Sequence, residues 1–162
     1  MAKITSAVEQ FVEAESLDRV SIGVHFRNTD RSGQATMHFA AIDRILRRDP
    51  DPVVFLATDS EEGLEAFKDR YGDMIRILPK QFGDGGRPIH SSGTDEEKSS
   101  RAIEAIRDLW MLRSTDHLIY QGESTFGQLA QAMRSVPHET VFNVSRRKPG
   151  YQLRSLFWRL AN

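Results

Sequence analysis

The chain has 162 residues, of which 39% are hydrophobic and 28% are charged, as in a single globular domain with a substantial core. Its formal net charge of −1 gives no general attraction to nucleic acids or anionic membranes. The absence of cysteine excludes disulfides, thiolate catalysis and cysteine-ligated zinc. No apolar run could cross a bilayer, and the N-terminus lacks the apolar core of a signal peptide, so a cytoplasmic location is expected.

Strand and helix patterns alternate along the sequence, because short apolar runs are followed by segments with apolar residues at helical spacing. In chain order we expect a helix over 3–14, a strand over 20–26, a helix over 37–48, a strand over 53–57, a helix starting after Asp59 and reaching Tyr71, a strand over 74–78, a helix over 94–113, a strand over 117–120, a helix over 124–134 and a strand over 140–144.

Two helix starts carry capping signals. Asp59 is followed three residues later by Glu62, and Thr94 is followed by Glu97, a pattern typical of the first turn of a helix. The inward face of the second of these helices is expected to consist of Ile103, Ile106, Leu109 and Trp110.

Alternation of this length predicts an α/β fold with a doubly wound, mainly parallel, five-stranded Rossmann-like sheet and helices on both faces. Residues 1–145 are expected to form this domain. Residues 146–162 mix basic and apolar side chains and are expected to form a tail helix that packs on the domain or on a partner.

Polar residues follow each predicted strand, at the edge where such a sheet binds its ligand. His25, Arg27 and Asp30 follow the first strand, and Asp59 follows the second. A glycine-rich loop over 81–87, the segment 121–125 and the segment 143–148 follow the others. A guanidinium suits a diphosphate, and hydroxyls at a helix start can cradle a phosphate, so a nucleotide-sized anionic ligand is predicted.

Three segments resemble the motifs of the α1,6-fucosyltransferases, the family of the core fucosyltransferase and the rhizobial nodulation enzymes. The first runs over 22–33, the second over 54–60, and the third over 106–117 together with 122–126. Their order and spacing also agree, and the similarity extends from about Ser21 to Met133.

This resemblance implies the GDP-fucose-binding domain of an inverting, metal-independent fucosyltransferase, the C-terminal half of a two-domain GT-B enzyme. Arg27 would clamp the β-phosphate and stabilise the departing GDP, and Asp108 would accept the two donors on the edge of guanine. His25 would lie by the nucleoside, and Ser124 and Thr125 would bind the diphosphate. The donor-binding residues carried over are His25, Arg27, Asn28, Asp59, Asp108, Ser124 and Thr125.

The sequence departs from this family at two site positions. Asn28 stands where the core enzymes carry a second arginine, and Ala35 stands where they carry a glutamate proposed as the general base. Asp30 or His38 are the substitutes considered for that base, so Arg27 and Asp30 are the candidate catalytic residues. Only about twenty residues precede the first strand, so the acceptor domain is expected to be missing from this chain, which is then an excised half or a stand-alone donor module.

Alternatives to these interpretations stay open. The chain could be a non-catalytic module that binds a guanine nucleotide or a nucleotide sugar, and Asp108 could simply pair with Arg107 or cap a loop. The Asp49–Asp51 pair resembles a metal-binding pattern but precedes a strand at the opposite edge, so no metal and no cofactor is expected. A nucleotide sugar, an unidentified carbohydrate acceptor and a second copy of the chain are the expected partners, and nucleic acid is not. The acceptor and the identity of the GDP-linked sugar are not determined.

Overall fold

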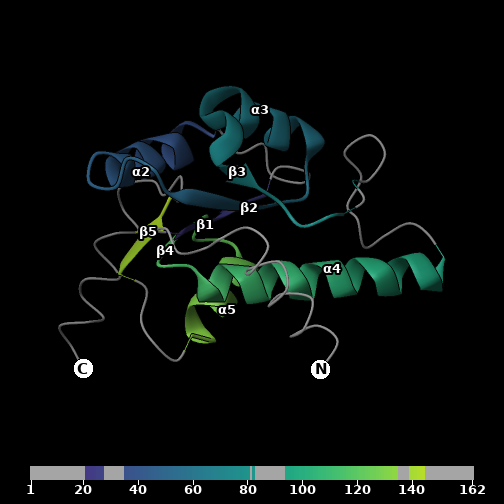
Figure 1. Ribbon diagram of the computed structural model, residues 1–162. Helices are drawn as coiled ribbons and strands as arrows, with labels where there is room; N and C mark the ends of the chain where they lie inside the picture. Colours follow the sequence, from purple (N-terminus) through teal and green to yellow (C-terminus); the bar gives the residue numbers. More distant parts are fainter. Residues whose placement is uncertain (1–20, 28–34, 81, 83–93, 135–138, 145–162) are drawn as a thin grey trace, which may run out of the picture.

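In a computed structural model, which describes residues 21–27, 35–80, 82, 94–134 and 139–144, one five-stranded parallel sheet organises the chain (Figure 1). Its strand order is β3-β2-β1-β4-β5. The elements are β1 (Ser21–Phe26), α2 (Thr36–Leu46), β2 (Val53–Thr58), α3 (Glu61–Tyr71), a 3₁₀ turn η1 (Gly72–Met74), β3 (Ile75–Arg76), α4 (Asp95–Ser114), β4 (His117–Tyr120), α5 (Thr125–Ala132) and β5 (Thr140–Asn143).

Strand β1 lies at the centre of the sheet, and all six of its residues are buried. It pairs with β2 from Ser21↔Val53 onward and with β4 from Ile22↔His117 onward. A near-continuous apolar strand is what a sheet covered on both faces requires. The predicted parallel α/β fold is therefore confirmed.

Helices cover both faces of the sheet, with α2 and α3 on one side and α4 and α5 on the other (Figure 1). Alternate residues of β1 divide between the two layers because the side-chain period of a strand is two. Val24 packs in the hydrophobic cluster with Ile42 of α2 and Phe67 of α3. On the other face, Leu112 of α4 packs with Leu118 of β4.

The start of β1 is tied to the turn before β4 by Asp116. Its Oδ2 accepts hydrogen bonds from the Ser21 N–H (2.9 Å) and the Ser21 hydroxyl (2.7 Å). The Ser21 hydroxyl oxygen accepts in turn from the Asp116 N–H at 3.0 Å. This reciprocal contact holds the two neighbouring strands β1 and β4 in register.

One of the two predicted helix starts is correct and the other is shifted by one residue. Thr94 and Glu97 form the complete capping box of α4. Helix α3 is capped by Ser60, whose hydroxyl accepts from the Gly63 N–H at 3.0 Å, and not by Asp59 as predicted. The carboxylate of Asp59 is directed instead toward Arg27.

The predicted inward face of α4 is wrong over its first half. Ile103 and Ile106 are 42% and 40% exposed, whereas Leu109 is buried. Helix α4 projects past the strands (Figure 1), so only its last turns meet the sheet. Helical periodicity identifies which face of a helix is apolar. It does not reveal over what length the sheet covers that face.

Strand β3 comprises two residues, fewer than the five predicted over 74–78, because η1 includes residue 74 and the chain leaves the sheet after Arg76. The predicted helix over 3–14, the tail over 146–162 and most of the glycine-rich loop lie outside the described residues. Among the helices that are described, none is both long and apolar enough to cross a membrane.

Gly23 occupies a position in β1 with no room for a side chain. A Cβ built there would lie 2.5 Å from Thr115 Oγ1 and 3.2 Å from Leu112 Cδ2. We expect Gly23→Ala to lower the free energy of unfolding by about 1–3 kcal/mol, as overpacking of a close-packed core does. Urea denaturation measures the change.

A double-mutant cycle separates this clash from a general loss of strand stability. Thr115→Ala removes the atom nearest to the new methyl group, so the double variant is expected to lose less than the sum of the two single variants. Strict additivity, or full stability of Gly23→Ala, would contradict the close approach.

Candidate functional site

A pocket of about 460 Å³ lies at the carboxyl ends of β1 and β2, against α4 and the first turn of α5. Four residues predicted from the sequence, His25, Arg27, Asp59 and Asp108, line it. The edge of the sheet predicted to bind ligand is therefore hollow. The full lining is His25, Arg27, Ala57, Thr58, Asp59, Lys80, Phe82, Lys98, Arg101, Ala102, Glu104, Ala105, Asp108 and Phe126.

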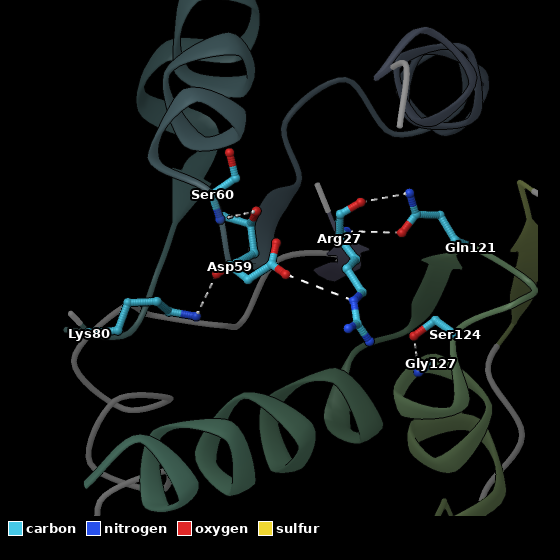
Figure 2. A network of polar contacts seen from close by, with 8 residues as sticks. Arg27, Asp59, Ser60, Lys80, Gln121, Ser124 and Gly127 are labelled. Carbon is cyan, nitrogen blue, oxygen red and sulfur yellow. Dashed lines mark hydrogen bonds and ion pairs between the residues drawn. The ribbon is translucent and has the colours of Figure 1, made fainter. Parts of the chain in front are cut away.

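The backbone of Arg27 is fixed by the side chain of Gln121 (Figure 2). Gln121 Oε1 accepts from the Arg27 N–H at 2.9 Å, and Gln121 Nε2 donates to the Arg27 carbonyl oxygen at 3.0 Å. One amide thus satisfies both backbone groups of the residue that follows β1, where the ladder of the sheet ends. The sequence placed Gln121 at this edge but did not predict this contact.

The Arg27 side chain extends toward Asp59 (Figure 2), and its Nε lies 4.0 Å from Asp59 Oδ2. The two side chains are 33% and 23% exposed, so water screens the pair and its contribution to stability is small. Its main effect is on orientation, because the carboxylate attracts the guanidinium and both side chains line the pocket. An anionic ligand could then form paired hydrogen bonds with the same guanidinium.

Asp108 is held inside the pocket by Lys80, which the sequence analysis missed. Their side chains are 10% and 7% exposed and are joined by an ion pair between Lys80 Nζ and Asp108 Oδ2. Lys80 Nζ also donates to the Thr58 carbonyl oxygen at 3.3 Å. Of the two alternatives left open for Asp108, pairing with Arg107 is wrong, since the cation beside it comes from the segment after β3.

Burial raises the pKa of Asp108 to about 6, and the attraction of Lys80 offsets only part of this rise. Asp108 Oδ1 is buried and has no hydrogen-bond partner among the described residues. A buried carboxylate on the apolar side of a helix requires a cation, and Lys80 comes two residues after the strand predicted over 74–78. That position made Lys80 a candidate in the sequence, but its contact with Asp108 depends on the tertiary structure.

His25 is buried at the end of β1, where its ring stacks on Phe126 with centroids 5.0 Å apart and an interplanar angle of 29°. Burial lowers the pKa of His25 to about 4, so the imidazole is neutral at pH 7. Among the described residues its Nδ1 has no hydrogen-bond partner. The pair supplies an uncharged aromatic wall to the pocket.

Ser124 and Thr125 lie at the start of α5 but outside the pocket lining. The Ser124 hydroxyl caps the helix by accepting from the Gly127 N–H at 3.4 Å, as Figure 2 shows, and Thr125 is exposed. The Ser124 N–H donates to the Gln121 carbonyl oxygen at 2.8 Å, which keeps this turn close to Arg27. Their predicted contact with a diphosphate stays a prediction, and Asn28 and Asp30 lie outside the described residues.

His38 is not placed to act as a base in this pocket. It is 1% exposed and lies in the core beneath α2, with its ring edge-on to Phe26 at 5.1 Å and to Phe67 at 6.3 Å. The helical period turns this position toward the sheet rather than toward the strand ends.

Three further acidic residues have a defined place in the structure. Glu104 of α4 lines the pocket. Asp49 and Asp51 precede β2 at the opposite edge of the sheet, as predicted. Within the described part of the chain, no group of three or more histidine and acidic residues could hold a metal ion.

Comparison with solved structures finds fucosyltransferases. NodZ α1,6-fucosyltransferase co-crystallised with GDP aligns with 83% of this chain at 19% identity and a TM-score of 0.58, and the match covers 42% of that protein. Fucosyltransferase NodZ from Bradyrhizobium aligns with 83% of this chain at 20% identity and a TM-score of 0.60, and the match covers 43% of that chain. POFUT1 in complex with GDP-fucose aligns with 89% of this chain at 12% identity and a TM-score of 0.59, and the match covers 47% of that chain.

These matches confirm, at the level of the fold, the resemblance to fucosyltransferases that the sequence motifs predicted. The chain spans less than half the length of each of these proteins. No family model matches the sequence, and no curated protein matches it. The division at residues 145 and 146 stays a prediction.

The Gln121 contact is expected to contribute to folding stability. Gln121→Leu removes two partly buried hydrogen bonds, each of about 1 kcal/mol, so the free energy of unfolding should fall by about 2 kcal/mol. Gln128→Leu is the matched control, because it removes one bond, to the Gly122 carbonyl oxygen, and should cost about half as much. Equal losses in the two variants would argue against the double contact.

His38 is expected to make the fold sensitive to acid. Burial lowers its pKa from 6.5 to about 4, so between these pH values the unfolded chain binds a proton that the folded chain does not. Stability from this residue is therefore complete above pH 6.5 and decreases, by about 3 kcal/mol, as the pH falls to 4.

His38→Leu tests this directly by urea denaturation at pH 7 and pH 4. Both ring nitrogens of His38 lack partners among the described residues, so an apolar side chain of similar size should be tolerated at pH 7. The difference in stability between the two pH values should shrink in the variant by about 3 kcal/mol. An unchanged difference would show that His38 is not buried in its neutral form.

Proposed function

We propose that this chain is the donor-binding part of a fucosyltransferase-like glycosyltransferase and that its pocket binds GDP-fucose. The observation that carries the proposal is that Arg27 and Asp108, from segments 81 residues apart in sequence, line one pocket at the carboxyl edge of the sheet. One is suited to a diphosphate and the other to a base that presents N–H donors. Fucosyltransferases solved with GDP and with GDP-fucose share the fold.

Arg27 has the properties that departure of a nucleoside diphosphate requires. Breaking the bond between a sugar and a diphosphate builds negative charge on the leaving oxygen. A guanidinium already held in place stabilises that charge without having to reorganise. Gln121 fixes the backbone of Arg27 and Asp59 orients its side chain, so both supports are present before a ligand arrives.

The finer parts of the proposal follow from the same chemistry. A guanidinium and backbone amides can stabilise the leaving group without a metal, so we propose metal-independent transfer. Inversion at the anomeric carbon is proposed from the resemblance to the α1,6-fucosyltransferases. Asp30 stays the candidate base. The acceptor is a carbohydrate hydroxyl whose binding region we assign to another domain or a second copy, since the chain spans less than half of the fucosyltransferases it matches. A cytoplasmic location stays part of this proposal.

A non-catalytic module is the alternative function. Asn28 and Ala35 replace the second arginine and the glutamate of the resembling family, which removes one charge from the phosphate clamp and one candidate base. Such a module would use the same pocket to bind a guanine nucleotide or a nucleotide sugar. It would not break the bond between the sugar and the diphosphate.

Calorimetric titration with GDP, GDP-fucose, UDP and ADP tests the shared pocket. We expect GDP and GDP-fucose to bind more tightly than UDP and ADP. Arg27→Ala should weaken every diphosphate by about tenfold or more, and Asp108→Ala should remove most of the preference for GDP over ADP. Arg48→Ala is the control, because it deletes the same charge at the opposite edge of the sheet.

The outcomes of two assays separate the candidate functions. Failure of every nucleotide to bind, or equal binding by Arg27→Ala, would refute both. If GDP-fucose binds, its reaction is monitored by proton NMR of the anomeric signal. Release of fucose, or its transfer to an added sugar acceptor, supports the enzyme. A protein that binds GDP-fucose and leaves it intact with every acceptor is the module.

A further inference from the structure

The Lys80–Asp108 pair has a chemistry that the proposed phosphate clamp does not use. Both side chains are at least nine-tenths buried, both line the pocket, and they lie at the β2 and α4 side of it. Burying two charges costs several kcal/mol per ion, so a pair retained inside a ligand pocket is a weak contributor to folding stability. A role for this pair in binding the ligand of the pocket would explain why it is buried there.

Two hydrogen-bonding positions of this pair are unused among the described residues. Lys80 Nζ has three N–H donors, and its partners are Asp108 Oδ2 and the Thr58 carbonyl oxygen. Asp108 Oδ1 is buried without a partner. Among the described residues the pair therefore has one strong donor and one strong acceptor without partners, and each is more costly to leave unpaired than an exposed group would be.

A guanine base carries the complementary pattern on one edge, with the O6 acceptor beside the N1–H and N2–H donors. Adenine presents an amino donor at position 6 and an acceptor at N1, so both of its groups would face a like group of the pair. We propose that Lys80 is a specificity-determining residue that donates to the 6-keto oxygen of the base while Asp108 accepts from its ring N–H. This inference rests on the proposed function and assigns Lys80 a role that the sequence motifs did not include.

The neighbouring side chains support this orientation. His25 is neutral and stacked on Phe126, so it provides an aromatic wall and no competing charge for the base. Arg27 and Lys80 line the same pocket, and in the view of Figure 2 Asp59 lies between them, so the guanidinium forms a second cationic position to which we assign the diphosphate. A nucleotide would then extend from the buried ion pair to Arg27.

The test compares GDP with 6-thio-GDP, in which sulfur, a weak acceptor, replaces O6 while N1–H and the 2-amino group are kept. We expect the wild-type protein to bind GDP about tenfold more tightly than 6-thio-GDP at pH 7, the ratio that one hydrogen bond to a charged donor produces. In Lys80→Met this ratio should fall to about one, and in Lys80→Gln, which keeps a neutral donor, it should be intermediate.

The ratio distinguishes recognition from a structural role. If Lys80 only supported the fold, its loss would weaken both ligands equally and leave the ratio unchanged. Lys68→Met removes the same charge from an exposed position on α3 outside the pocket lining and should change neither affinity. Thermal melting of each variant, with Lys80→Gln as the milder substitution, shows that the protein tested is folded.

The two proposals fail in different ways. GDP that binds through Arg27 with an unchanged ratio in Lys80→Met and Lys80→Gln would overturn the role of Lys80 and leave the proposed function intact. Equal affinities of the wild-type protein for GDP and 6-thio-GDP would likewise overturn the role of Lys80 and leave the proposed function intact. A chain that binds no GDP at all would overturn both.

Discussion

Strand β1 is hydrogen-bonded to a parallel strand on each side, and this double pairing fixes where the chain can place a ligand. Its register with β2 and β4 brings the ends of three strands to the same edge, so the residues after each strand converge without any further device. The same pairing requires a glycine at position 23, because the end of α4 and Thr115 pack directly on the strand. Packing of the core and position of the site are thus consequences of one arrangement.

The pocket is built from two electrostatically different parts. Arg27 and Asp59 are partly exposed, so water and salt weaken their mutual attraction. Lys80 and Asp108 are buried, so their attraction is stronger and their unused hydrogen-bonding groups are costly. Under the proposed function, the partly exposed cation suits a highly charged diphosphate, and the buried pair suits a flat base that loses its own water on binding.

The same fold as in the fucosyltransferases accompanies identities of only 12–20% in the three compared structures. Such divergence leaves the sheet intact because volume and pattern, rather than particular residues, determine a core. A site has less freedom, since each polar group needs its own partner. The replacements at Asn28 and Ala35, and the presence of Lys80, are therefore where the chemistry of this chain is most open to differ from that of the enzymes it resembles.

Alternation of short apolar runs with helical periods was enough to predict the parallel sheet, the two helical layers and the edge that carries the pocket. These features depend on local patterns and on the handedness of crossovers, both of which are written in the sequence. Arg27 and Asp59 were found for the same reason, since each directly follows a strand. The partner of Asp108, the contact between Gln121 and Arg27, the burial of His38 and the exposed half of α4 were decided only by the tertiary structure. Each depends on the distance between segments far apart in sequence, and the pattern of a single segment contains no information about that distance.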